Sequence, residues 1–248
     1  MDADALARSL ERPASGEAFS ADALRGLPEP ARGLLVRAVA EGAPLASFAR
    51  LSLAGTFRLG RRTLRFTATE TIAPARGFVW RFRMRLGPFP VTGVDSYAGG
   101  EGRLDARLLG LLPLARASGP EVSRSAAGRL AAESLWVPTA LLPRSGATWE
   151  ARDGSMVRVS LPVENETPVV EIEVAADGRV VRTATERWRE GDAKNGRPAG
   201  PAIFETMVEG ERVFGPYTIP LPARAGWRSP EGVFEEFIEV DAVAAVFG

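Results

Sequence analysis

The stretch GFVWRFRMRL, residues 77–86, alternates large apolar side chains with arginines. Phe78, Trp80, Phe82 and Met84 share one face of an extended chain, because successive side chains of a β-strand point to opposite sides. A period of two with bulky residues on one face predicts a strand whose apolar side is buried.

The same period of two recurs before and after this stretch. Asp-Gly pairs at 153–154 and 177–178 separate alternating runs, which is typical of hairpin turns. About a dozen predicted strands joined by short turns indicate an antiparallel sheet. The other alternating segments lie at 47–59, 62–73, 91–100, 102–115, 148–153, 155–163, 168–175, 179–188, 202–209, 211–214, 217–227 and 234–244.

Two parts of the chain have the composition of helices. Residues 1–43, with Ser20 as an N-cap, are expected to form a helical segment packed on the main body. Residues 44–248 are expected to form a single antiparallel β domain with a helical insertion at about 121–137. The insertion, EVSRSAAGRLAAESLW, ends before Pro138, which cannot continue a helix.

A chain with this order of elements has to bury one face of a large sheet. Full closure into a barrel is one solution, and curling around the central helix is another. We expect a mainly β (α+β) fold with a large curved antiparallel sheet, half-barrel-like or an open barrel, around one central helix, with N-terminal helices. Trp136 would then plug the interior at the end of that helix.

The composition excludes several kinds of active site. The 248 residues contain no cysteine and no histidine, which rules out disulfides, cysteine–metal sites, Ser-His-Asp triads and imidazole chemistry. The 31 basic and 31 acidic residues cancel, so no overall charge attracts nucleic acid. We expect no cofactor, no metal and no nucleic-acid partner, and the composition favours a non-enzymatic protein.

The N-terminus, MDADALARSLERP, lacks the basic and apolar regions of a secretory signal. The chain has no apolar run near the roughly 20 residues that span a bilayer. We therefore expect a cytoplasmic protein without an integral membrane segment, and the sequence leaves the oligomeric state open.

Longer motifs resemble a known family. The order of residues 77–121, followed by AESLWVPTALLP, resembles an uncharacterised bacterial family of unknown function, as do RVVRTATERW and GPYTIPLP. The most specific parts are the W-x-P-T-A-L-L-P block and the D-S-Y segment. The strand number and central helix also resemble the half-barrel of lipoprotein carrier proteins. That resemblance implies a curved sheet that wraps around helices and holds acyl chains.

A candidate binding site follows from the apolar strand face and the end of the central helix. Pockets for hydrophobic ligands are mostly apolar with a few polar anchors. The polar anchors we expect are Glu133, Tyr97 and Arg83. The predicted ligand-binding residues are Phe78, Trp80, Phe82, Met84, Tyr97, Glu133, Leu135, Trp136, Arg83 and Asp95.

The charged residues of this set need partners. A carboxylate on a helix inside a sheet is costly unless it is paired, so Arg83, Arg107 or Arg116 is expected beside Glu133. Such a pair could be a ligand anchor, an acid–base group, or a structural ion pair. The arginines on the outer face of residues 77–86 indicate a solvated sheet face, with acidic residues such as Glu70 pairing across strands.

The run LLGLLPLA, residues 108–115, is more apolar than an alternating strand requires. It could line a lipid cavity, touch a membrane, or form a strand buried on both faces.

Three functions remain open from the sequence. The first is a binding protein that holds a lipid-like or other hydrophobic small molecule in a β-sheet cavity. The second is an enzyme that uses carboxylate, Arg or Tyr chemistry on a small molecule, with Glu133 and Asp95 as acid–base candidates. The third is a structural or interaction module with a filled core.

Overall fold

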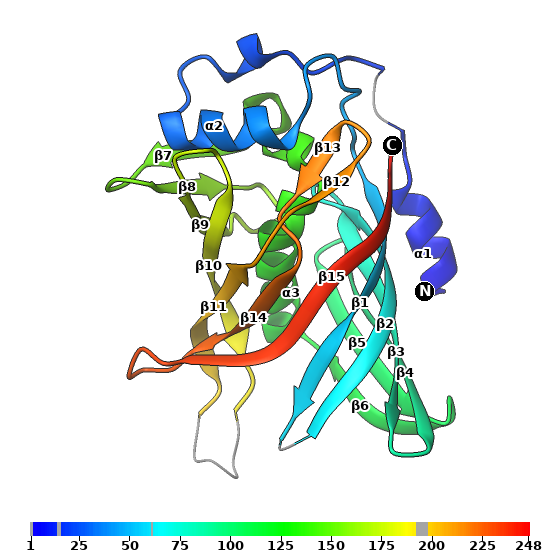
Figure 1. Ribbon diagram of the computed structural model, residues 1–248. Helices are drawn as coiled ribbons and strands as arrows, with labels where there is room; N and C mark the ends of the chain where they lie inside the picture. Colours follow the sequence, from blue (N-terminus) through cyan, green and yellow to red (C-terminus); the bar gives the residue numbers. More distant parts are fainter. Residues whose placement is uncertain (1, 14–15, 61, 192–197) are drawn as a thin grey trace.

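The computed structural model describes residues 2–13, 16–60, 62–191 and 198–248. One antiparallel sheet of thirteen strands curves around one helix, with β6 and β7 as its two open edges (Figure 1). The strands β12 and β13 pair with each other in a separate two-stranded sheet. The predicted fold class is therefore confirmed, and of the two solutions considered, the sheet curls around the helix and does not close.

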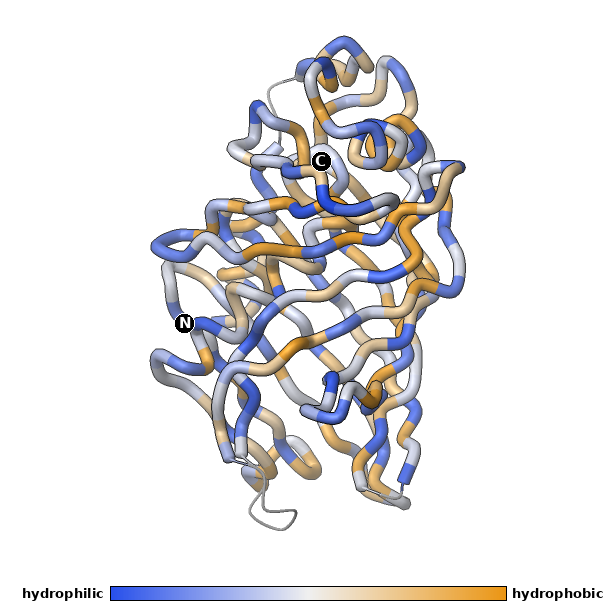
Figure 2. Tube along the Cα trace, turned by 90° about the vertical axis from the view of Figure 1, so that its left-hand side faces the viewer, coloured by the Kyte–Doolittle hydropathy of each residue, from blue (hydrophilic) through white to orange (hydrophobic). Residues whose placement is uncertain are grey.

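The strands follow the alternating pattern of the sequence, which Figure 2 shows as a change of hydropathy from residue to residue. Their bounds are β1 Ala49–Leu59, β2 Arg62–Ala73, β3 Gly77–Leu86, β4 Phe89–Ala98, β5 Glu101–Leu108, β6 Leu112–Ser118, β7 Thr148–Ala151, β8 Met156–Ser160, β9 Val169–Val174, β10 Val180–Arg189, β11 Gly200–Val208, β12 Arg212–Phe214, β13 Tyr217–Ile219, β14 Ala223–Arg228 and β15 Phe234–Phe247.

Three α-helices and four short 3-10 turns occur among the described residues. The α-helices are α1 Ala3–Leu10, α2 Glu29–Ala38 and α3 Pro120–Glu133, and the 3-10 turns are η1 Ala21–Leu24, η2 Ser134–Trp136, η3 Pro138–Leu141 and η4 Pro143–Ser145. Among the described residues, no helix is long and apolar enough to cross a membrane.

The last strand joins two arms of the sheet. The N-terminal arm contains β1 to β6 as a meander, and the C-terminal arm contains β14, β11, β10, β9, β8 and β7 in spatial order. β15 pairs with β1 on one side and with β14 on the other, so the two ends of the β domain meet at the middle of the sheet.

Helix α3 bridges the two arms across the concave face, where it packs against β5 of one arm and β10 of the other (Figure 1). At β5 the helix approaches the strand backbone directly. A Cβ atom on Gly102 would lie 2.8 Å from the carbonyl oxygen of Val122, and the Gly102 amide donates to Ser123 Oγ at 2.9 Å. Glycine at this position therefore lets the helix sit on the sheet.

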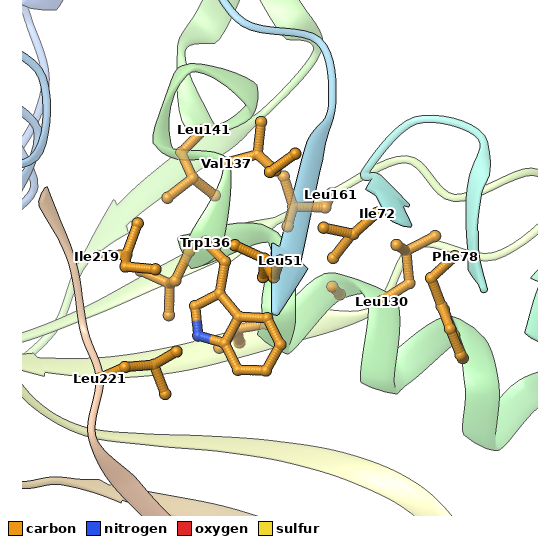
Figure 3. Close-up of a cluster of buried hydrophobic side chains, with 14 of the residues drawn as sticks. Leu51, Ile72, Phe78, Leu130, Trp136, Val137, Leu141, Leu161, Ile219 and Leu221 are labelled. Carbon is orange, nitrogen blue, oxygen red and sulfur yellow. The ribbon is translucent and has the colours of Figure 1, made fainter. Parts of the chain in front are cut away.

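Beyond α3, the chain closes one end of the half-barrel. Trp136, in η2, lies within a cluster of buried apolar side chains that includes Leu51, Leu130 and Ile219 (Figure 3). Val137 and Leu141 from the same segment join this cluster. Helix α2 covers the cluster at this end of the half-barrel. The prolines that follow Trp136 start the 3-10 turns η3 and η4, which lead to β7.

A smaller apolar layer lies on the outer face of the N-terminal arm. Ala7 and Leu10 of α1 pack there against Phe48, Ala73 and Val79. The first helix thus covers the opposite face of the sheet from α3.

Truncation of Trp136 tests the importance of the closed end. We expect Trp136→Ala to lower the free energy of unfolding by about 3–5 kcal/mol, the usual cost of deleting a large aromatic side chain from a packed core. Chemical denaturation measures this change. The exposed Val213 on β12 is the control, because Val213→Ala should change stability by no more than about 0.5 kcal/mol. Equal effects of the two substitutions would contradict the packing described.

Candidate functional site

The register of the sheet places two carboxyl groups in one row on its concave face. Glu70 of β2 pairs with Trp80 of β3, which pairs with Asp95 of β4. Leu51 and Leu104 continue the row into β1 and β5. Glu70 is completely buried, so it needs a compensating charge or a proton.

Arg129 of α3 supplies the charge. Its Nη1 donates to Asp95 Oδ2 at 2.7 Å and its Nη2 donates to Glu70 Oε1 at 3.2 Å. Its Nε donates to both carboxylate oxygens of Glu133, one turn further along α3, at 2.8 and 2.9 Å. The guanidinium carbon lies 4.4 Å from the centroid of the Phe78 ring. We call Glu70, Asp95, Arg129 and Glu133 the charged layer.

This arrangement corrects two predictions. Glu70 does not pair with the outer arginines of β3, because β2 points its side chain to the concave face. Glu133 does not pair with Arg83, Arg107 or Arg116, since an arginine four residues earlier on its own helix reaches it first.

Burial and neighbouring charge shift the protonation equilibria of the charged layer. Burial, followed by the nearby Glu133 carboxylate, raises the pKa of Glu70 well above its ordinary value of 4.5. Burial alone would lower the pKa of Arg129, but Glu133, Glu70 and Asp95 together raise it. Glu70 Oε2 has no hydrogen-bond partner among the described residues, and a proton on it would supply a donor toward Glu133.

A second arginine lies on the other arm. Arg187 of β10 donates through Nε to the carbonyl oxygen of Ser125 at 3.0 Å and stacks 4.5 Å from the centroid of the Phe204 ring. The ring of Trp227 lies 5.7 Å from the same guanidinium carbon. No carboxylate of the described residues forms an ion pair with Arg187. Burial, and then the charge of Arg129, lower the pKa of Arg187 to about 10, so it stays a cation at neutral pH.

The structure separates the predicted site residues into three groups. The apolar residues Phe78, Phe82 and Leu135 are buried in the same core as Trp80, Tyr97 and Trp136, and Met84 packs against this core while partly exposed. Asp95 and Glu133 meet in the charged layer. Arg83 lies apart from both groups, exposed on the outer face of β3.

An open groove of about 2150 Å³ crosses the outer face of the N-terminal arm, from α1 to the start of α3. Arg83, Phe82 and Tyr97 contribute to its lining. Most of its arginines are neutralised, because carboxylates lie beside them. These ion pairs are Arg81–Asp4, Arg103–Glu101, Arg107–Asp105, Arg116–Asp105 and Arg124–Glu166. The groove therefore offers an anionic ligand little unpaired positive charge.

Sequence reasoning missed Arg129 and Arg187, the two interior cations. The spacing of four between Arg129 and Glu133 on a predicted helix was a usable signal. Arg187 had no such signal, since it shares its strand face with Thr183 and Thr185 and its contacts come from α3 and β11.

The geometry defines a half-barrel with a charged layer beneath its bridging helix. The chain belongs to DUF6544, a family of unknown function, whose model matches residues 17–239. This membership confirms the resemblance to a family of unknown function drawn from the sequence. A comparison with curated proteins gives no match.

Several crystal structures are similar to this chain at low sequence identity. A DUF1329 family protein from Desulfovibrio piger is 11% identical over 82% of this chain and 86% of that chain, with a TM-score of 0.44. A putative outer membrane lipoprotein-sorting protein domain from Vibrio parahaemolyticus is 9% identical over 81% and 85%, with a TM-score of 0.43. A LolA superfamily protein from Nitrosomonas europaea is 8% identical over 87% and 90%, with a TM-score of 0.45.

The raised pKa of Glu70 makes stability depend on pH. The folded protein keeps a proton on Glu70 that the unfolded chain loses above about pH 4.5, so stability should fall as pH rises. Relative to Glu70→Gln, the wild type should lose up to about 1.4 kcal/mol per pH unit until Glu70 ionises in the folded state. Denaturant titrations across pH measure this difference. A difference between the two proteins that is constant with pH would show that Glu70 is ionised throughout.

Removal of Arg129 should leave Asp95 and Glu133 without their cation. We expect Arg129→Met to cost about 3–5 kcal/mol of unfolding free energy, as breaking a buried ion pair usually does. The control is Arg103→Met, whose partner Glu101 is exposed, and which should cost no more than about 0.5 kcal/mol. Thermal or chemical unfolding compares the two variants, and similar small losses would mean that the charged layer contributes little.

Proposed function

We propose that the protein is a non-enzymatic binding protein for a hydrophobic small molecule that carries an anionic group. The anionic group would meet Arg187, and the apolar part would lie against the concave face of the sheet. The observation that carries the proposal is Arg187 itself, a cation inside the half-barrel with no carboxylate partner among the described residues.

The surroundings of Arg187 suit an anion. Its only hydrogen-bond acceptors in the described part of the chain are the carbonyl oxygen and, at 3.4 Å, the hydroxyl of Ser125. A guanidinium presents five N–H donors in a planar fork, so donors remain for a carboxylate or phosphate. The rings of Phe204 and Trp227 hold the guanidinium in place by stacking. An anion at this site would also relieve the repulsion from Arg129 that lowers the pKa of Arg187.

The concave face below the charged layer suits an apolar chain. Three apolar side chains of the N-terminal arm, Phe57, Met84 and Leu108, pack against the core but stay partly exposed. Ile238 and Val240 of β15 behave in the same way. Partly exposed apolar surface that is continuous with a core is a usual feature of ligand sites.

The hydrogen bonds of the carboxyl groups in the charged layer support a binding function over acid–base catalysis. Arg129 donates hydrogen bonds to one carboxylate oxygen of Asp95 and to both of Glu133, which occupies these oxygens. A general acid or base has to reach a ligand proton within hydrogen-bond distance. Groups tied to a buried guanidinium are better suited to hold α3 on the sheet.

Native mass spectrometry of the purified protein, followed by titration with a long-chain fatty acid and with the alcohol of equal chain length, tests this function. We expect the wild type to bind the fatty acid at least about tenfold more tightly than the alcohol, since only the acid carries a charge for Arg187. Arg187→Met should remove this preference and leave weak binding of both molecules.

The matched control is Arg158→Met. Arg158 lies on β8 of the same arm, but its ion pair with Glu171 is on the outer face. This variant should bind like the wild type. The proposal would be overturned if the wild type bound neither the fatty acid nor the alcohol, or if the two arginine substitutions had equal effects on binding. Either result would favour a filled core. Circular dichroism of each variant confirms that the fold is intact.

A further inference from the structure

The edge of the N-terminal arm carries an exposed apolar segment that the interior site does not use. All residues from Leu109 to Arg116 are exposed, so the expectation of a strand buried on both faces is wrong for this run. Leu111 is 79% exposed and Leu112 57%. Phe89, the first residue of β4 after the β3–β4 turn, is 49% exposed. We call Phe89, Leu109, Leu111, Leu112 and Leu114 the apolar tip.

The two turns of the apolar tip lie directly side by side. The amide of Leu109 donates to the carbonyl oxygen of Pro90 at 2.8 Å, and Val91 pairs with Leu108 in the adjoining strands. In Figure 1 the β3–β4 and β5–β6 turns form the end of the N-terminal arm that lies away from α2. The apolar side chains therefore form one protruding patch contributed by two hairpins.

The backbone at Leu109 is unfavourable for leucine. Leu109 has a φ of 56° and Gly110 a φ of 71°, a pair of left-handed residues as in the tight turns that join hairpin strands. Asn or Gly is the usual residue at the first of these positions, because a side chain with a bulky Cβ substituent is strained there. Leu109 is also 48% exposed. Leucine is therefore unfavourable at this position for two reasons, the left-handed backbone and the contact of its apolar side chain with water. Contact with an apolar partner would offset both costs.

The geometry of the edge disfavours another β-strand as this partner. Pro113 lies inside β6 and has no N–H to donate. The pairing of β5 with β6 shifts register between Ala106 and Arg107, which bends the strand. Both features are known to protect sheet edges from pairing with a further strand.

The charge around the apolar tip is positive. No acidic residue occurs in residues 83–94 or 106–120, which contain both turns. Arg83 and Arg85 lie on β3 beside the first turn, and Arg85 donates to the carbonyl oxygen of Pro88 within that turn. Arg107 and Arg116 flank the second turn and share the single carboxylate of Asp105. Exposed aliphatic side chains with an arginine border match the boundary between acyl chains and anionic headgroups.

From these observations we infer that the apolar tip inserts its leucines and Phe89 into the surface of a lipid bilayer that contains anionic lipids. Arg83 and Arg85 of β3 contact the headgroups, and the sheet itself stays outside the bilayer. This inference does not depend on the interior site, since the tip and Arg187 lie on different arms.

Flotation of the full chain with vesicles tests the inference. One vesicle type is phosphatidylcholine alone, and the other contains equal parts of phosphatidylcholine and phosphatidylglycerol. We expect the wild type to float with the mixed vesicles, to bind phosphatidylcholine vesicles less, and to be released in part by high salt. The double variant Leu111→Asp/Leu112→Asp should bind the mixed vesicles with an affinity at least about tenfold lower than that of the wild type.

Two further double variants separate the contribution of the tip leucines from the effect of added negative charge and from the contribution of the arginines. Val213→Asp/Val243→Asp changes two exposed valines on β12 and β15, 70% and 65% exposed, and should bind like the wild type. Arg83→Gln/Arg85→Gln should lose the preference for mixed vesicles and keep the weaker binding to phosphatidylcholine. Because all these positions are exposed, the variants should keep the circular dichroism spectrum of the wild type.

Three results would overturn the inference. The first is a wild type that stays unbound with both vesicle types. The second is an equal loss of binding in the leucine and valine double variants. The third is a concentration-dependent dimer, seen by light scattering, that Leu111→Asp/Leu112→Asp converts to a monomer while vesicle binding stays unchanged. That result would identify a second copy of the chain as the partner of the tip.

Discussion

Arg129 compensates carboxyl groups from three different elements, and the position of the bridging helix depends on this. Its donors reach Glu70 on β2, Asp95 on β4 and Glu133 on α3 itself. The rings of Phe78 and Trp80 flank the same guanidinium. A buried cation with this many specific acceptors has few equivalent positions, so it fixes the register of the helix on the sheet more tightly than apolar packing would.

The charged layer divides the interior into parts with different packing. On one side, Trp136 and its neighbours fill the half-barrel, and the 3-10 turns and α2 close it. On the other side, apolar side chains of β1, β3 and β15 stay partly exposed. The same sheet thus has a closed end with fully packed apolar side chains and an open end where apolar side chains stay partly exposed. Arg187 lies at the boundary, since its pKa responds to Arg129 and, in the opposite direction, to Glu133.

Local patterns in the sequence predicted the sheet and its helix, because strand alternation and proline stops depend on neighbours along the chain. Alternation around Trp80 indicated a strand with a buried aromatic face, and Pro138 marked the end of the helical segment. The partner of Glu70 was not predictable in this way. Glu70 continues the apolar face of β2, and its cation comes from 59 residues further along the chain. For Arg187, the decisive fact is that no carboxylate of the described residues pairs with it in space, which no local pattern encodes.

The charged layer also limits the length of any molecule that lies along the strands of the N-terminal arm. On β2, Glu70 lies six positions from Leu64, which is the buried apolar residue nearest the β1–β2 turn. At about 3.3 Å per residue this segment spans roughly 20 Å. An acyl chain aligned with it would reach the charged layer at one end and the hairpin turns at the other. The depth of the half-barrel would then act as a ruler that selects among apolar chains by length.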